Sequence, residues 1–239
     1  MSLLSPLPDV SISLRVLARL LSYPDARLQR DLPDMREALR SRPILAPSRL
    51  AELDALMSTL AGGNRLDNEA AYVELFDRGR ATSLHLFEHV HGDSRDRGPA
   101  MIDLTQTYEK AGLFLAEGEL PDYLPVVLEF VSTQPPREAR AFLREMAHIF
   151  RAIFSALQQR ESAYASVLGA LLEISGENAQ AVKIVPDEAM DASWEEPVVF
   201  DGCSSKGQAR PGQAQAIHFV KNDAARVNAN GAAHQGASA

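Results

Sequence analysis

The most constraining feature of the sequence is a long apolar stripe in its second half. Seven large apolar residues recur there at mostly three- and four-residue intervals: Phe142, Met146, Ile149, Phe150, Ile153, Phe154 and Leu157. This spacing places the side chains on one face of an α-helix, whereas a half-buried strand requires alternating apolar and polar residues. No alternating run is long enough for a sheet, and no repeat occurs at a fixed period. The sequence therefore predicts an all-α protein.

Shorter stretches with the same spacing fill the chain as far as Gly176, and local signals predict where helices begin and end. The first helix is expected to cover Val10–Tyr23 and to stop before Pro24. Pro33 and Pro99 are expected in the first turns of later helices. Helix N-caps are predicted at Ser48, Asp67 and Ser83, and helix ends at Gly62, Gly79, Gly92 and Gly176. Together these signals predict one helical bundle domain over residues 1–176.

Composition changes after the bundle. Residues 177–200 mix scattered apolar residues with acidic ones, and Trp194 lies there within SWEEPVVF. We expect this segment to be partly ordered, with the tryptophan docked on the bundle as a large apolar anchor; the alternative is that it presents a partner site. Residues 201–239 are mostly Gly, Ala, Gln, Asn and Ser. Because such a segment has little apolar surface to bury, it is predicted to be a disordered, flexible tail.

Charge and cysteine content exclude several classes of function. The net charge of −8 argues against affinity for nucleic acid or anionic membrane, both of which favour positive charge. The single cysteine, Cys203, cannot form an internal disulfide or a Cys-based metal cluster by itself. The apolar N-terminus is interrupted by Asp9 and Arg15 and lacks the features of a signal peptide. No apolar run reaches the roughly 20 residues that span a bilayer. We therefore expect a cytoplasmic protein that does not insert into the membrane.

Charged residues and histidines are concentrated in the stretch Tyr72–Gly98, YVELFDRGRATSLHLFEHVHGDSRDRG. His85, Glu88 and His89 match H-x-x-E-H, the inverted zinc-protease pattern. Glu88–His91 and Glu145–His148 give two Glu-x-x-His pairs of the kind that di-metal helical bundles use. A metal-dependent hydrolase of the helical-bundle type is therefore one hypothesis. The other is a binding groove whose histidines are hydrogen-bonded to nearby carboxylates and backbone. No phosphate-binding loop or nucleophile elbow accompanies these residues.

The same stretch carries a specific family resemblance. YVELFDRGRATSLHLFEHVHGDSRDRGPAM closely resembles the signature of the NarJ-type chaperones, which assist assembly of the molybdenum cofactor into respiratory nitrate reductase. LARLLSYPD, LPDYLPVVLEFVS and SWEEPVVF resemble a first-helix ending, a mid-domain helix and a C-terminal segment of that family. The resemblance covers most of Leu14–Phe200 and leaves the tail outside.

The resemblance implies an all-helical fold shared with redox-enzyme maturation chaperones, and a protein that is not an enzyme and holds no cofactor. It implies that the partner is the catalytic (alpha) subunit of respiratory nitrate reductase, including its N-terminal peptide. The chaperone would hold the apo subunit for cofactor insertion and complex assembly before the subunit docks at the membrane. The molybdenum cofactor delivery machinery is a further partner that this role implies.

Peptide binding is assigned to the central stretch. Tyr72, Leu75 and Phe76 are expected to form an apolar wall, with Leu86, His89 and Val90 across from it. The charged and polar residues expected to position or supplement that wall are Asp77, Arg78, Arg80, Glu88 and His91. An acidic helical bundle suits an amphipathic or basic helix bound in a groove. Histidines in the groove predict an affinity that depends on pH near the intrinsic histidine pKa of about 6.5.

Overall fold

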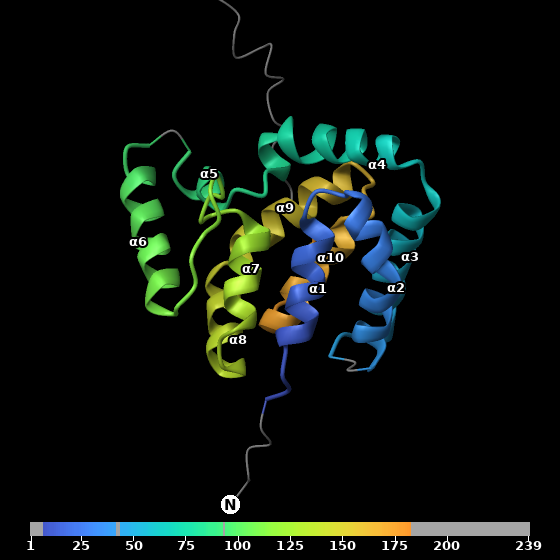
Figure 1. The fold of residues 1–239 in the computed structure, drawn as a ribbon, viewed down its shortest axis with the longest axis horizontal. Helices are drawn as coiled ribbons and strands as arrows, with labels where there is room; N and C mark the ends of the chain where they lie inside the picture. The colour runs from blue at the N-terminus through green and yellow to red at the C-terminus, as the bar shows by residue number, and fades with distance from the viewer. Residues whose placement is uncertain (1–6, 42–43, 93, 183–239) are drawn as a thin grey trace, which may run out of the picture. The chain divides into compact units, whose positions relative to one another are not determined.

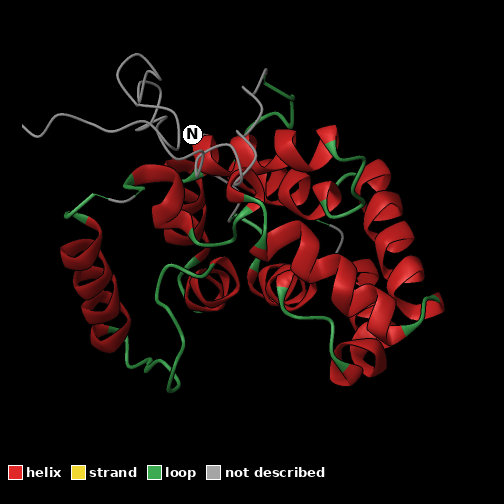
Figure 2. Cartoon of the chain, turned by 90° about the horizontal axis from the view of Figure 1, so that it is seen from above, coloured by secondary structure: helices red, strands yellow, loops and turns green. Residues whose placement is uncertain are grey.

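The computed structural model describes residues 7–41, 44–92 and 94–182, and these residues form helices joined by turns and loops (Figure 2). The all-α prediction is confirmed. Among the described residues, strand-type pairing is limited to one isolated bridge between His85 and Tyr123. None of the described helices is both long and apolar enough to cross a membrane.

The described helices follow one another along the chain with few long connections. In order they are α1 (Ser11–Leu21), α2 (Ala26–Ser41), α3 (Pro47–Gly62), α4 (Arg65–Tyr72), the π-helix η1 (Val73–Asp77), the 3-10 helix η2 (Arg80–Thr82), α5 (Leu86–Val90), α6 (Arg97–Lys110), α7 (Leu124–Ser132), α8 (Pro136–Glu145), α9 (Ala147–Gln159) and α10 (Ala165–Ser175).

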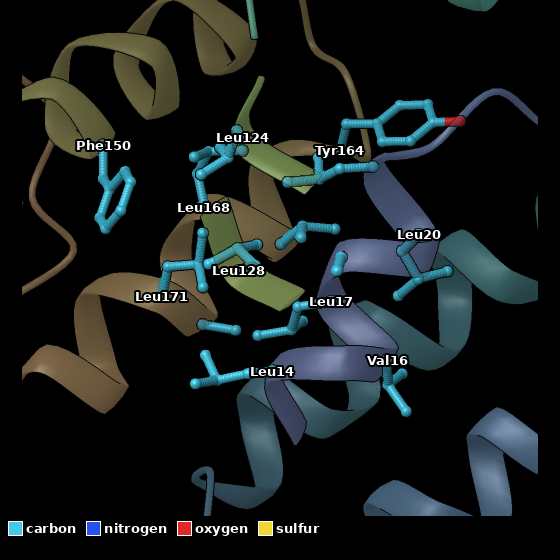
Figure 3. Close-up of a cluster of buried hydrophobic side chains, with 14 of the residues drawn as sticks. Leu14, Val16, Leu17, Leu20, Leu124, Leu128, Phe150, Tyr164, Leu168 and Leu171 are labelled. Atoms are coloured by element: carbon cyan, nitrogen blue, oxygen red, sulfur yellow. The ribbon is translucent and has the colours of Figure 1, made fainter. Parts of the chain in front are cut away.

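The core is built around α1, α7 and α10. Helix α10 is buried along most of its length and packs against α9, α8 and α3, while α1 packs against α7 and α2. Figure 3 shows leucines of these three helices meeting in one cluster, among them Leu14, Leu17, Leu128, Leu168 and Leu171. Each fully buried leucine of this kind stabilises the fold by about 1.5–3 kcal/mol.

The long apolar stripe supplies two helices instead of one. Helix α8 ends at Glu145, Met146 adopts a ψ of −1°, and α9 begins at Ala147. Leu143 of α8 and Phe150 of α9 are nevertheless both fully buried. The apolar spacing continues across the break, so periodicity alone could not reveal it.

The predicted start of the second helix is wrong. Helix α2 begins at Ala26, and Pro33 lies inside it instead of in its first turn. The Asp25 carboxylate explains the earlier start, because it accepts hydrogen bonds from the backbone N–H groups of Arg27 and Leu28 at 3.0 and 2.8 Å. A carboxylate that satisfies free N–H groups in this way favours helix initiation.

Other predicted helix boundaries also shift by a few residues. The cap of α3 is Ala46 instead of Ser48, and the cap of α4 is Asn64 instead of Asp67; the Asn64 side chain accepts the N–H of Leu66. Helix α5 begins at Leu86, since Ser83 receives the N–H of His85 without starting a helix, and α6 begins two residues before Pro99. The π-helix η1 ends at Asp77 with Arg78 as its C-cap, so Gly79 directly follows the helix end, where it was predicted. Gly92 and Gly176 follow helix ends with φ of 52° and 85°, as glycine at such positions permits.

Helix α6 lies to one side of the other helices in Figures 1 and 2. Tyr108 is the buried residue of α6. Its hydroxyl donates a hydrogen bond to the Pro121 carbonyl oxygen at 2.8 Å, and its ring centroid lies 4.8 Å from that of Phe130. Tyr108 therefore ties the end of α6 to the loop before α7 and to α7 itself.

The predictions for the C-terminal part concern residues outside the described ones. The segment 177–200 is described only as far as Val182, and Trp194, Cys203 and all of residues 201–239 lie beyond it.

Candidate peptide-binding site

The site begins with a change of helix type. Helix α4 runs without a break into the π-helix η1, where the Arg78 N–H bonds the Val73 carbonyl oxygen five residues earlier at 3.3 Å. Short π-helical segments of this kind occur frequently at functional sites. Tyr72 and Phe76 stay four residues apart on one face, with ring centroids 4.8 Å apart.

Aromatic rings hold this face in place. Tyr164, just before α10, packs edge to face against Tyr72 and Phe76, with ring centroids 6.2 and 5.1 Å apart. Tyr23 packs against Tyr72 in the same way, with ring centroids 5.7 Å apart. Edge-to-face packing is a favourable aromatic geometry. The rings therefore join α4 and η1 to the ends of two core helices.

The Tyr72 hydroxyl fixes the same face by hydrogen bonds. It donates to the Leu21 carbonyl oxygen at 2.7 Å and lies 3.0 Å from the Tyr123 hydroxyl. Burial, reinforced by the neighbouring Tyr123, raises the pKa of Tyr72 far above its ordinary value. The hydroxyl thus remains protonated and acts as a structural donor between the end of α1 and the start of α7.

The opposite wall is formed by two loops paired through their backbones. The N–H of Leu86 bonds the Asp122 carbonyl oxygen at 3.0 Å, and the N–H of Leu124 bonds the Leu84 carbonyl oxygen at 2.8 Å. These bonds flank the isolated bridge between His85 and Tyr123, whose ring centroids are 5.4 Å apart. The pairing presents His85 and Tyr123 side by side.

A buried carboxylate locks these loops together. The Asp122 side chain is fully buried; its oxygens accept the N–H of Phe87 at 3.2 Å and lie 3.4 Å from His85 Nδ1 and 3.9 Å from the Arg97 guanidinium. The hydrogen bond to Asp122 raises the pKa of His85, and burial opposes that shift in part. A buried acid requires such partners, since an unpaired buried charge is costly.

Between the two walls lies a hollow of about 440 Å³, which we name the tyrosine pocket; this volume is within the roughly 300–1,000 Å³ of typical ligand sites. It is lined by Tyr23, Tyr72, Phe76, Asp77, Leu84, His85, Gly118, Glu119, Leu120 and Tyr123. Tyr23 and Leu120 are each 44% exposed, so large apolar groups face the solvent here. The carboxylates of Asp77 and Glu119 add negative charge. The pocket suits an apolar segment that also carries a positive charge.

The predicted site residues fall into separate places. Tyr72, Phe76 and Asp77 line the tyrosine pocket, while Leu75 packs partly against the core. Arg78 pairs with Glu74 at 2.8 Å beside a different hollow, and Arg80 is exposed in η2.

The α5 residues of the prediction are not among the lining residues. Leu86 is buried in the core, and His89 Nε2 bonds the Ser83 carbonyl oxygen at 2.9 Å. Glu88 lies 3.6 Å from Arg97, His91 meets the ring of Phe87, and Val90 is 52% exposed. The wall facing Tyr72 and Phe76 is therefore formed by Leu84, His85 and Tyr123 instead.

Sequence reasoning missed the contribution of the loop before α7. Glu119, Leu120 and Tyr123 line the pocket, and Asp122 supports it from within. The sequence signal was the turn Leu120-Pro121-Asp122-Tyr123, whose acidic and aromatic residues follow one another directly. Among the described residues, no three His, Cys, Asp or Glu side chains are grouped so that they could hold a metal ion.

Comparison with known proteins identifies the family. A family model described as "Nitrate reductase delta subunit" matches residues 45–168, which is more than half of the chain. The Escherichia coli (strain K12) protein "Nitrate reductase molybdenum cofactor assembly chaperone NarJ" is 43% identical over 198 residues, which cover 79% of this chain and 84% of that protein.

The chain belongs to the nitrate reductase delta-subunit family.

A second relative supports membership of the delta-subunit family, and a solved structure shares the fold. The "probable" assembly chaperone NarW of Escherichia coli (strain K12) is 39% identical over 197 residues, covering 78% of this chain and 82% of that protein. A crystal structure of a putative redox enzyme maturation protein from Archaeoglobus fulgidus matches the fold with a TM-score of 0.53 at 19% identity, covering 74% of this chain and all of that one. The NarJ-type resemblance of the central stretch is thus confirmed.

Proposed function

We propose that this protein is a chaperone that holds the apo catalytic subunit of respiratory nitrate reductase while the molybdenum cofactor is inserted and the complex assembles. The proposal is supported by family membership and by the names of the relatives, which describe NarJ and NarW as molybdenum cofactor assembly chaperones. Binding occurs in the cytoplasm, before the catalytic subunit docks at the membrane.

The tyrosine pocket is the observation that carries the proposal for peptide binding. Its aromatic walls offer a preformed apolar surface, and Asp77 and Glu119 favour a basic side chain beside that surface. An N-terminal segment that is amphipathic and basic matches this chemistry, and burying its apolar side chains supplies the main driving force.

Rigidity of the pocket also favours binding. The edge-to-face rings around Tyr72 and the buried carboxylate of Asp122 fix both walls before any partner arrives. A preformed pocket spares the ordering cost that a flexible surface would incur on binding. In this proposal, the side chains of the tyrosine pocket bind and orient the apo catalytic subunit and leave its covalent structure unchanged.

Isothermal titration with the N-terminal peptide of the catalytic subunit tests where the client binds. Leu120→Ser alters an exposed apolar residue inside the pocket, and Val90→Ser alters an exposed apolar residue on α5 outside it; the two are 44% and 52% exposed. We expect Leu120→Ser to weaken binding about tenfold and Val90→Ser to change it less than about twofold, differences of about 1.4 and 0.4 kcal/mol. The reverse pattern would move the site to α5.

A cellular measurement tests the assembly role. In cells that lack the chaperone, we expect the catalytic subunit to accumulate without molybdenum cofactor, because the apo subunit is no longer held for insertion. Cofactor content of the purified subunit provides the readout. A fully loaded subunit in such cells would contradict the proposal.

A further inference from the structure

A second hollow lies on the other side of the loop before α7. It has a volume of about 370 Å³ and is formed by the end of α6, the loop that follows, α7 and Arg15 of α1; we name it the α6–α7 groove. Its apolar surface comes from Tyr108, Leu113, Val126 and Phe130. Phe114 lines it and is 80% exposed, a large apolar ring left almost entirely in water.

The groove combines this apolar surface with excess negative charge. Glu119 and Glu129 line it, and neither forms an ion pair with another described residue. Arg15 lines it too, and its Nε donates a hydrogen bond to the Ser132 hydroxyl at 3.2 Å. Partial burial raises the pKa of Glu129 and the charge of Glu119 adds to that shift, whereas Arg15 and Arg19 lower it. Arg19 is itself paired with Asp25 and Asp31, at 2.7 and 3.6 Å. A further positive charge would therefore be attracted to this site.

Two properties of the groove indicate the shape of its occupant. The groove has a volume of about 370 Å³, near the lower limit of the roughly 300–1,000 Å³ of ligand sites. A groove of this size admits a few large side chains from one face of a helix or strand of the partner. The described residues offer no strand edge beside the groove to which an extended peptide could add itself. Helix-in-groove binding, with anchors spaced at three and four residues, meets both conditions.

We propose that the α6–α7 groove docks an amphipathic helix of a partner polypeptide, which places large apolar side chains against Phe114 and Val126 and a lysine or arginine against Glu129. This surface is separate from the tyrosine pocket, although Glu119 lines both hollows. A helix bound in the α6–α7 groove therefore does not occupy the tyrosine pocket, whose walls include Tyr72 and Phe76.

The test uses the full-length chain and a synthetic amphipathic helical peptide with leucines at positions i, i+3, i+4 and i+7 and one lysine beside them. A second peptide has glutamate in place of that lysine. By isothermal titration, the lysine peptide binds wild type, and its affinity falls about tenfold for Phe114→Ser, for Glu129→Gln and for the glutamate peptide. Phe114 is so exposed that its replacement leaves the fold intact.

Matched control variants separate the two hollows. Leu7→Ser removes another exposed apolar residue that lines neither hollow, and Asp77→Asn neutralises a carboxylate that lines only the tyrosine pocket. Both controls are expected to retain the wild-type affinity for the lysine peptide within about twofold. Hydrogen exchange provides a second readout, in which bound peptide slows exchange of the Leu113 and Leu115 amides.

Each alternative outcome overturns the proposal. Loss of binding with Asp77→Asn but not with Glu129→Gln would place the peptide in the tyrosine pocket. Equal affinity for the lysine and glutamate peptides would remove the charge complementarity, and absence of binding to wild type would remove the groove as a docking surface. Titration of the Leu120→Ser variant with the N-terminal peptide of the catalytic subunit tests the tyrosine pocket independently. Either proposal can therefore be refuted without the other.

Discussion

Replacing Tyr72 by phenylalanine tests how the tyrosine pocket is held together. The change keeps the ring contacts with Phe76 and Tyr164 and removes a buried hydroxyl that bonds the Leu21 carbonyl oxygen at 2.7 Å and lies 3.0 Å from the Tyr123 hydroxyl. Two hydrogen bonds are lost, at about 0.5–1.5 kcal/mol each. The Tyr123 hydroxyl, already 3.5 Å from the Leu21 oxygen, can recover part of that loss. We therefore expect a decrease in unfolding free energy of about 1–2 kcal/mol.

Tyr164→Phe is the matched control for that variant. The Tyr164 hydroxyl is buried and has no hydrogen-bond partner among the described residues. Removing an unpaired buried hydroxyl relieves a desolvation cost, so this variant should be as stable as wild type or more stable. Urea unfolding followed by circular dichroism measures the unfolding free energy of both variants. In thermal unfolding, Tm should fall by about 2–8 °C for Tyr72→Phe and should not fall for Tyr164→Phe. Equal stability of the two variants would refute the assigned role of the Tyr72 hydroxyl.

Three further predictions concern other parts of the same framework. Asp122→Ala removes the buried acceptor of the Phe87 N–H and should destabilise the fold by about 1.5–3 kcal/mol in urea unfolding; an unchanged midpoint would contradict its role as a lock. The raised pKa of His85 means that its protonated form stabilises the fold fully below its unfolded pKa of about 6.5, and that this contribution disappears as pH rises through the folded pKa. The excess stability of wild type over His85→Gln should thus shrink as pH rises, and a widening gap would reverse the assigned sign. Gly176→Ala places a side chain at φ 85° and should cost about 1–2 kcal/mol, whereas Gly98→Ala, inside α6 with open space around it, should cost nothing measurable.

Most of the fold could be predicted because the core is built from residues at helical spacing. The buried faces of α1, α9 and α10 are the apolar stripes of the sequence. Errors concentrate at helix ends, where several residues compete for one role. Asn64 and Asp67 are both good N-cap residues. Only the folded chain shows that the Asn64 side chain accepts the Leu66 N–H.

The candidate site could be predicted in part for a related reason. Tyr72 and Phe76 share a helix face, so their spacing reveals them. Tyr123 and His85 come from loops far apart in the sequence, and their pairing depends on backbone bonds between Leu84, Leu86 and the loop before α7. Local sequence carries no signal for which loops pair in this way. The α5 residues are predicted from the polar stretch that they share, yet none of them lines the pocket.

The position of Asp122 limits how this site could be transferred to another scaffold. Its carboxylate contacts His85, accepts the N–H of Phe87 in the first turn of α5 and approaches Arg97 at the start of α6, while its own loop carries Tyr123. A graft that copied only the conspicuous Tyr72–Gly98 stretch would leave out this carboxylate and the second wall. A working transplant would have to carry four distant stretches together: the end of α1, Tyr72–Arg97, the turn before α7 and Tyr164 before α10.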